Sequence, residues 1–250
     1  MQNGIRTLTS TDLNTLTTAQ TEVFGALGQT DDGRVFRYVK FGGTATITPG
    51  LVMSGPAAPA NSTALAITAA GTGGQVAANF KAGSNSLVVT NGVTSVTANQ
   101  FQYLELVTAT DLTYSLKIAG HTSAGSGGYV KIQLDEPLPL NATTLIAGTD
   151  TANLVYSHYN GVGASTTGNA PAGVTTVVVP NTASVTNYGW VQSGGKAFVK
   201  ATTATIGLGI AQDLSGTAGY VIISAATTGN IGWAKASAAS NTASVILNIN

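Results

Sequence analysis

The chain has 250 residues, of which 43% are hydrophobic and only 8% carry a formal charge, against about 25% in ordinary globular chains. Ten basic and ten acidic residues cancel, and the basic ones are scattered, which argues against a nucleic-acid partner. The absence of cysteine excludes disulfides and thiolate metal sites.

The first segment, residues 1–40, is predicted to be an N-terminal arm or to contain a short helix. Apolar side chains at 10–27 have nearly helical spacing, and residues 10–12 offer a cap. Several threonines in this stretch lose rotamer freedom in a helix, which leaves an extended arm as the alternative.

The start of the chain lacks the pattern of a secretion signal, and no apolar run approaches the roughly 20 residues of a membrane span. A non-exported chain without a membrane partner is therefore expected.

From position 31 onward the pattern is that of short β-strands. Asp31 to Gly33 mark a turn, residues 34–41 alternate, and residues 44–48 alternate again after Gly42-Gly43. Further strands are predicted at 64–69, 75–80, 86–90, 103–107, 113–118, 129–134, 175–179, 188–192, 196–201, 206–211, 219–224, 231–234 and 244–249. Short β-branched runs separated by turn residues are typical of β-sandwiches and β-barrels.

The domain division is predicted from composition. Residues 151–174 are rich in Gly, Ala, Asn and Thr, which favours a linker. The sequence thus predicts an all-β fold with two β-sandwich or β-barrel-like lobes, 41–150 and 175–250, joined by this linker and preceded by the arm 1–40.

One phrase occurs twice: YVKFGGTATI at 38–47 returns as WVQSGGKAFV at 190–199. Each copy predicts a strand, a break and a second strand, because paired glycines let the backbone bend or adopt positive φ. Two copies are consistent with two related lobes, with one corner geometry used twice, or with chance in a chain of 31 glycines.

Longer phrases carry a resemblance over most of residues 31–250. They are DGRVFRYVKFGGTATITPG, VTANQFQYLELVT, YSLKIAGHTSAGSGGYVKIQLDEPL, YNGV, PAGV, NYGWVQSGGKAFV, IGLGIAQDLSGTAG and NIGWAKASAASNTASVILNI. In this order they resemble a family of tailed-phage virion proteins, the capsid decoration (cement) or minor capsid proteins. Members usually have a bulkier residue where this chain has Ser193. The resemblance implies a structural protein on the outer surface of a phage capsid, assembled in the host cytoplasm. Its implied partners are the major capsid protein and further copies of itself in a homotrimer.

Candidate binding residues follow from this expected role. The N-terminal segment is the expected gripping element, because an apolar segment with few charges can add to a sheet edge. Its candidate side chains are Ile5, Leu8, Leu13 and Leu16. Basic candidates for pairing with acidic capsid groups, with solvated strand-edge charges as the alternative, are Arg34, Arg37 and Lys40. Candidates for packing between subunits, with core positions as the alternative, are Trp190 and Trp233.

A search for catalytic chemistry finds no supporting motif. His121 and His158 have no other His, Cys or carboxylate at ligand spacing, so neither a metal nor a cofactor is expected. The acidic pairs 31–32 and 135–136 precede turn residues, and adjacent side chains of an extended chain point in opposite directions. A role in turns is therefore favoured over glycoside hydrolysis, and a protein without enzymatic activity is expected.

Two other functions stay open. A tail-fibre or glycan-binding host-recognition module would use exposed aromatic side chains beside amides, and YSHYNGV at 156–162 is such a cluster. A hydrolase such as a depolymerase would need paired acids, which ten scattered carboxylates make hard to place.

Overall fold

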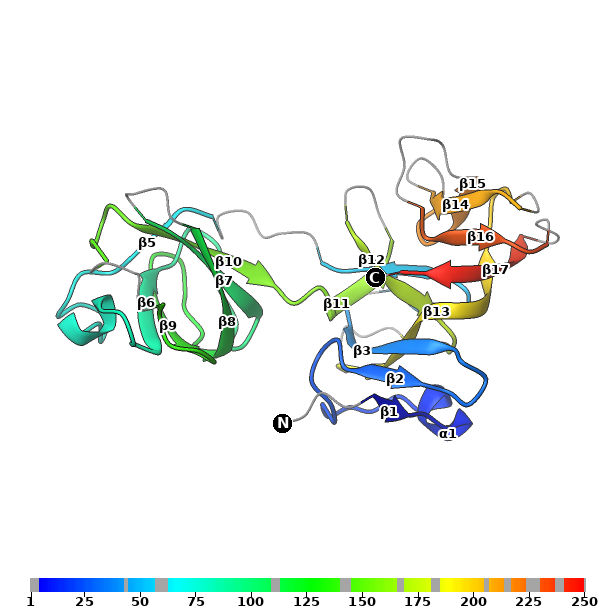
Figure 1. The fold of residues 1–250 in the computed structure, drawn as a ribbon, viewed down its shortest axis with the longest axis horizontal. Helices are drawn as coiled ribbons and strands as arrows, with labels where there is room; N and C mark the ends of the chain where they lie inside the picture. Colours follow the sequence, from blue (N-terminus) through cyan, green and yellow to red (C-terminus); the bar gives the residue numbers. More distant parts are fainter. Residues whose placement is uncertain are drawn as a thin grey trace. The chain divides into compact units, whose positions relative to one another are not determined.

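The computed structural model is almost entirely β, as the sequence predicts, with 47% of the chain in strands and 4% in helices. The residues that it describes are 5–42, 45–56, 63–108, 113–139, 145–165, 169–180, 185–204, 207–213, 217–223, 230–236 and 241–249. The chain divides into two compact units (Figure 1). Unit 1 comprises Met1–Ala57 together with His158–Asn250, and unit 2 comprises Ala58–Ser157.

These units differ from the predicted domains. The chain begins unit 1, builds the whole of unit 2 and then returns to complete unit 1. The predicted linker, 151–174, contains three strands: β10 (Thr151–Tyr156), β11 (Asn160–Ala164) and β12 (Pro171–Thr175). Its composition is misleading, because strand hydrogen bonds come from the backbone and small residues fit where neighbouring backbones approach closely. Gly42 N, for example, donates to Val162 O at 2.8 Å.

Unit 2 is an antiparallel barrel. Its strands are β5 (Leu65–Ala66), β6 (Ser86–Thr90), β7 (Phe101–Val107), β8 (Thr113–His121), β9 (Tyr129–Leu134) and β10. They pair in the order β5-β10-β7-β8-β9-β6, and a bridge between Ile67 and Val89 closes the ring. Alternate residues of β9 point inward, so that Val130, Ile132 and Leu134 join one hydrophobic core.

One predicted strand of unit 2 is wrong. Residues 75–80 end in a 3-10 helix, η1 (Ala77–Phe80). The amide side chain of Gln75 replaces backbone pairing there, since its Oε1 accepts a hydrogen bond from Val88 N on β6 at 3.1 Å. Gln75 is almost fully buried, and Phe80 is the buried residue of η1. A buried side-chain acceptor of this kind competes with a sheet ladder for the same backbone donor.

Unit 1 is built on one long, partly closed sheet. Its elements are β1 (Arg6–Thr7), α1 (Ser10–Asn14), β2 (Leu27–Gln29), β3 (Val35–Phe41), β4 (Val52–Ser54), β11, β12, β13 (Tyr188–Lys200), β14 (Gly209–Gln212), β15 (Val221–Ile223), β16 (Gly232–Ala234) and β17 (Thr242–Asn248). The strand order is β1-β2-β3-β11-β4-β12-β13-β17-β16-β14-β15, and β3 also pairs with β13. This additional pairing closes β3, β11, β4, β12 and β13 into a ring around Val39, Met53 and Val191.

Strand β13 joins the ring to the rest of the sheet. Its first half pairs with β3, and its second half, from Gly194 to Lys200, pairs with β17. The predicted strands 188–192 and 196–201 are therefore one strand, and Gly195, with φ of +81°, lies inside it. A residue with a side chain is strained at this φ, so glycine allows the bend between the two halves. Beyond it, Ala197 and Val199 enter a second core with strand β17.

The repeated phrase has a structural counterpart within unit 1. Tyr38 of β3 lies directly opposite Trp190 of antiparallel β13, so the two copies are neighbouring strands. This arrangement excludes the interpretation in which the chain has two related lobes and each lobe contains one copy of the phrase. In the first copy, Gly42 is required by a close approach, because a Cβ there would lie 2.8 Å from the carbonyl oxygen of Gly161.

Candidate functional site

The structure contradicts the prediction of a gripping N-terminal arm. Leu8 and Leu13 are buried, with 3% and 6% of their surface exposed, and they pack against Tyr38 and Trp190. Helix α1 carries Leu13 inward and begins with a capping box between Thr9 and Asp12. Leu8 and Leu13 thus have a partner in their own chain, the face of β3 and β13 that lies outside the ring. These two are core residues of unit 1 and are not available to a capsid.

The remaining apolar candidates of the segment differ from each other. Leu16 is partly buried and packs against the core inside the ring, while Ile5 is 57% exposed.

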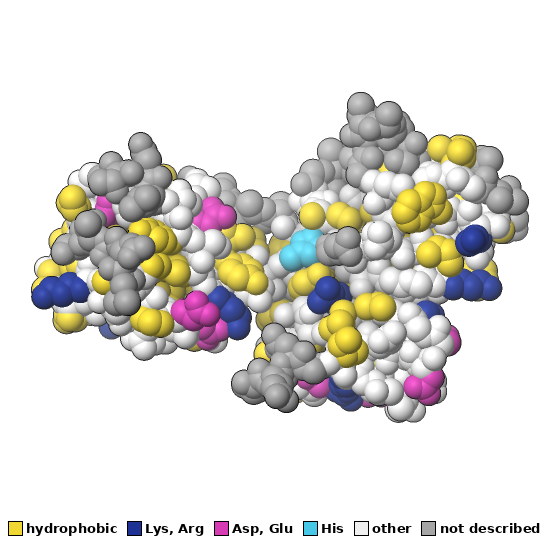
Figure 2. All heavy atoms as spheres, in the orientation of Figure 1, with side chains coloured by type: hydrophobic (Ala, Val, Ile, Leu, Met, Phe, Trp, Pro, Cys, Tyr) yellow, Lys and Arg dark blue, Asp and Glu magenta, His cyan; other side chains and the backbone are white. Residues whose placement is uncertain are grey.

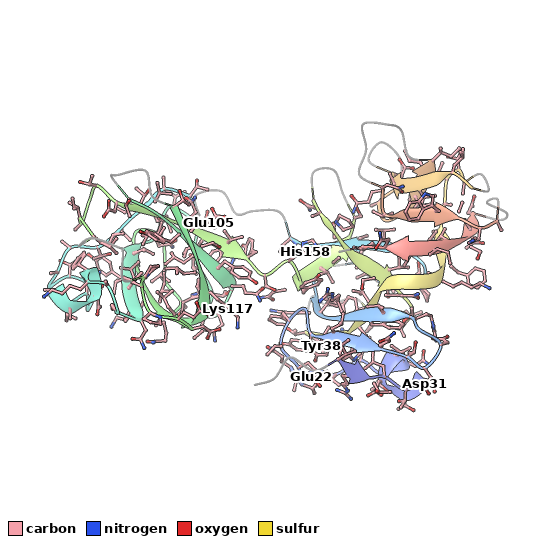
Figure 3. The ribbon with its side chains drawn as sticks, in the orientation of Figure 1. Glu22, Asp31, Tyr38, Glu105, Lys117 and His158 are labelled. Atoms are coloured by element: carbon pink, nitrogen blue, oxygen red, sulfur yellow. The ribbon has the colours of Figure 1, made fainter. Side chains whose placement is uncertain are left out.

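Polar contacts also hold the N-terminal segment in place. The hydroxyl of Tyr38 accepts a hydrogen bond from Thr21 N at 3.0 Å and lies 3.1 Å from Thr21 Oγ1. Arg6 forms ion pairs with Asp12 and Glu22, and its guanidinium lies 5.9 Å from the centre of the Trp190 ring. These contacts hold residues 5–22 onto unit 1 (Figure 3 labels Tyr38 and Glu22).

A small cavity lies beneath this segment. Its volume is about 240 Å³, and its lining includes Arg6, Thr11, Tyr38, Tyr188 and Trp190. Arg6 lines this cavity and is held by two carboxylates of the same segment, Asp12 and Glu22, so its charge is already paired within unit 1. Hydrogen bonds from Thr9, followed by the charge of Arg6, lower the pKa of Asp12.

The predicted basic cluster does not form one surface. Arg37 Nη1 donates to the carbonyl of Gly25 at 3.1 Å, which uses the side chain inside unit 1. Arg34 pairs with Asp32 at 2.8 Å, and hydrogen bonds from Thr30 and then Arg34 lower the pKa of Asp32 to about 2. Lys40 is half-buried and, by strand alternation, lies on the opposite face of β3 from Arg37. No common capsid-facing patch results from these three residues.

The two tryptophans differ in exposure: Trp190 is buried and Trp233 lies at the surface. Trp190 is a core residue, 4% exposed, so its candidacy for packing between subunits is wrong. Its ring stands against Tyr38 with centroids 5.3 Å apart and planes at 69°. Trp233, on the short strand β16, is 47% exposed and stays available as a surface residue.

Trp233 belongs to an open sheet face. Across the antiparallel strands, Lys196 of β13 lies opposite Ile246 of β17, which lies opposite Trp233 of β16. Phe198 lies on the same face, two residues along from Lys196, and is 67% exposed. We call this surface the β13–β17–β16 face, made of Lys196, Phe198, Lys200, Trp233, Lys235, Ser244 and Ile246.

The charge of this face is all of one sign. Residues 158–250 contain three basic residues, Lys196, Lys200 and Lys235, and one acidic residue, Asp213. Lys200 follows Phe198 by two positions on β13, and Lys235 continues β16 through a hydrogen bond from its N to Ser244 O at 2.8 Å. All three lysines thus lie on the face, whereas Asp213 is buried and accepts a hydrogen bond from Thr202. Figure 2 shows basic and hydrophobic side chains together over the region of β16 and β17.

A second hollow is lined by residues of the cluster YSHYNGV. Its volume is about 510 Å³, and its lining includes His158, Tyr159, Asn230, Ile231 and Asn248. His158 Nε2 lies 2.8 Å from the carbonyl of Pro171, and the ring of His158 stands edge-on to that of Tyr159 at 5.0 Å (Figure 3 labels His158). An aromatic ring beside two amides is a combination that can bind a sugar.

His121 has a structural role in unit 2. It is buried; its Nε2 accepts from Phe101 N at 2.9 Å, and its Nδ1 lies 3.0 Å from Thr122 O. These contacts require the neutral ring with the proton on Nδ1. Burial lowers the pKa of His121, and the hydrogen bond to Thr122 partly opposes this effect.

One member of each acidic pair forms a local ion pair. Asp32 is held by Arg34, and Asp135 Oδ2 lies 2.5 Å from the Nζ of Lys117 on β8, which raises the pKa of Lys117. Within the described ranges, no group of three or more His, Cys, Asp or Glu residues is arranged to hold a metal ion. Over the same ranges there is no helix long and apolar enough to cross a membrane.

No family model, curated protein or solved structure matches the chain. Its function is therefore inferred from its own residues and their geometry.

Of the β13–β17–β16 face, only Trp233 was among the predicted site residues, although more of its signal is present in the sequence. Residues 196–200 read KAFVK, and the alternation of a strand puts Lys196, Phe198 and Lys200 on one side. An aromatic side chain between two lysines on the solvent face was a recognisable pattern. The addition of Trp233, Lys235 and Ile246 depends on strand register, which no local pattern contains.

Proposed function

We propose that this chain is a structural virion protein that binds the outer surface of a phage capsid as a decoration protein. The observation that carries the proposal is the presence of two compact units with separate hydrophobic cores in one chain. Each unit can offer a surface of its own, so one molecule can engage two sites on a shell. Linked weak contacts then become one tight attachment, which is how neighbouring capsid subunits would be stapled.

The energetic consequence is stabilisation of the shell. A protein that binds the assembled shell, and not its separate subunits, adds its binding free energy to the stability of the assembled state. The low charge of the chain favours this role, since little electrostatic repulsion opposes crowding of many copies on one surface. A homotrimer centred on a threefold position of the shell remains part of the proposal.

The test uses heads from a phage whose gene for this chain is deleted. The purified full-length chain is mixed with these heads, and co-sedimentation measures occupancy while differential scanning calorimetry measures shell stability. The proposal expects saturable binding and a higher melting temperature of the decorated shell. Absence of binding to mature heads at micromolar concentration would overturn it.

A glycan-binding host-recognition module is the second candidate, because the hollow beside His158 and Tyr159 combines an aromatic ring with Asn230 and Asn248. A glycan array probed with the full chain tests this function. Specific signals that disappear in Tyr159→Ala, with unchanged circular dichroism, would favour it. A blank array would leave the hollow without a sugar ligand.

A further inference from the structure

The β13–β17–β16 face combines exposed aromatic side chains with three lysines and has no carboxylate among its own residues. Phe198 and Trp233 are exposed, and half-buried Ile246 lies opposite Trp233 on β17. A lysine lies two positions from each aromatic residue along its own strand. The acidic residue nearest in sequence, Asp213, is buried and is bonded to Thr202. Lys200 also approaches the ring of Tyr220, 5.9 Å from its centre.

The opposite side of the same strands is packed. Ala197, Val199, Val245 and Leu247 alternate with the exposed residues and form a buried core with Ile210. The backbone beneath the exposed rings is therefore held by that core and by two ladders of hydrogen bonds. A surface fixed before binding loses little conformational freedom when a partner docks, so its contacts contribute fully to affinity.

We propose that the β13–β17–β16 face is a docking surface for another virion protein, one that presents carboxylates around an apolar site. The proposal rests on the function proposed above and names the surface that unit 1 contributes to shell binding. Exposed tryptophan and phenylalanine supply the centre of such an interface, where aromatic residues dominate binding energy. Lysine stems cover neighbouring apolar area while their ammonium groups reach the carboxylates of the partner.

Charge argues against a second copy of the chain as the occupant. A symmetric contact between two such faces would bring six lysines together with no acidic residue of the face between them. Like charges placed opposite each other disfavour association. The partner is therefore a different polypeptide with an acidic surface.

Geometry argues against single-stranded nucleic acid. Binding of that kind uses aromatic side chains on which successive bases stack. Here Phe198 and Trp233 are on strands separated by β17, and the residues between them are Ser244 and Ile246. The rings form no continuous stacking track.

The experiment measures binding to the undecorated heads described above. The apolar variant is Phe198→Ser with Trp233→Ser, and its control is Val93→Ser in unit 2, at a position that is 73% exposed. The charge variant is Lys196→Glu with Lys200→Glu and Lys235→Glu, and its control is Lys81→Glu with Lys131→Glu, both exposed in unit 2. Circular dichroism and thermal melting check that each variant is folded.

The expected result is a loss of affinity of at least about 30-fold for the apolar variant and near wild-type binding for its control. The charge variant is expected to bind more slowly and with a weaker dependence on salt than the wild type. If the wild type binds and both folded variants bind equally well, the docking surface is wrong while the proposed function stands. If the wild type itself does not bind heads, the proposed function falls and the docking surface falls with it.

Two further measurements complete the test. Fluorescence polarisation with a labelled oligothymidine at 150 mM salt is expected to show no binding; binding that the variants abolish would assign the face to nucleic acid instead.

Light scattering of the purified chain is expected to give the same oligomeric state for wild type and variants. A change confined to the variants would assign the face to self-association and overturn the proposal.

Discussion

Tyr38 and Trp190 are direct cross-strand partners in antiparallel strands β3 and β13. They are also the leading aromatic residues of the two copies of the repeated phrase. Their rings meet edge to face with centroids 5.3 Å apart, and the N-terminal segment covers them through Leu8 and Leu13. The repeat thus marks the place where the first and last parts of unit 1 are joined.

Replacement of Trp190 is expected to destabilise unit 1. Trp190→Ala removes a buried ring and leaves a cavity beneath the N-terminal segment, which costs about 3–5 kcal/mol of unfolding free energy. Trp233→Ala is the matched control, because its side chain is 47% exposed, and a change within about 1 kcal/mol is expected. Urea unfolding followed by circular dichroism measures both. Equal losses for the two variants would contradict the assignment of core and surface.

Deletion of residues 1–30 is expected to damage the core of unit 1. The deletion uncovers Tyr38, Phe36 and Trp190, which are buried in the intact chain. Increased binding of a hydrophobic dye and a lower melting temperature are the predicted results. A truncated chain with unchanged stability would restore the view that this segment is a free arm.

The glycine that begins the first Gly-Gly pair is expected to resist substitution. In Gly42→Ala the new Cβ would lie 2.8 Å from the carbonyl oxygen of Gly161, so backbone must shift, at a cost of about 1–3 kcal/mol. Gly163→Ala, on β11, is the control: its Cβ would meet no atom within 4 Å, and it needs no positive φ. Comparable melting temperatures for the two variants would show that the close approach at Gly42 is unimportant.

Unit 2 is expected to lose stability as the pH falls below about 6.5, the ordinary pKa of histidine. The folded state lowers the pKa of His121, so the neutral ring is preferred and its contribution to stability is present above the unfolded pKa. Below that value the unfolded chain binds the proton more readily, and stability falls by at most about 1.4 kcal/mol per pH unit for one proton.

Hydrogen exchange of the Phe101 amide, which donates to His121, reports this change locally. His121→Gln removes the titrating ring, so its exchange-derived stability is expected to vary less between pH 7 and 5 than that of the wild type. An identical pH dependence in both proteins would assign the effect to another group.

The sequence predicted strands well where the local pattern is clear. Strands β6 and β9 have the predicted bounds, 86–90 and 129–134: buried and exposed residues alternate in β9, whereas β6 is a short run with three consecutive buried residues at its centre. Residues 151–174 were taken for a linker, since a strand made of small residues has no side-chain pattern that distinguishes it from a loop. The pairing of β3 with β13 spans most of the chain, and no local signal encodes a contact of that range.

The candidate site was only partly predictable for the same reason. Strand alternation alone places Lys196 and Phe198 on one face. Register then adds Trp233 to that face, while it buries Trp190, so two residues of one type receive opposite roles. Leu8 and Leu13 were predicted to grip a capsid, whereas in the structure they pack against Tyr38 and Trp190 of their own chain.

Electron cryomicroscopy of the intact virion is the sharpest test of the proposed capsid-binding role. Density for both units of this chain is expected on the outer surface of the head, with the β13–β17–β16 face turned toward a neighbouring subunit. Density confined to the tail, or a head surface unchanged when the gene is deleted, would contradict it.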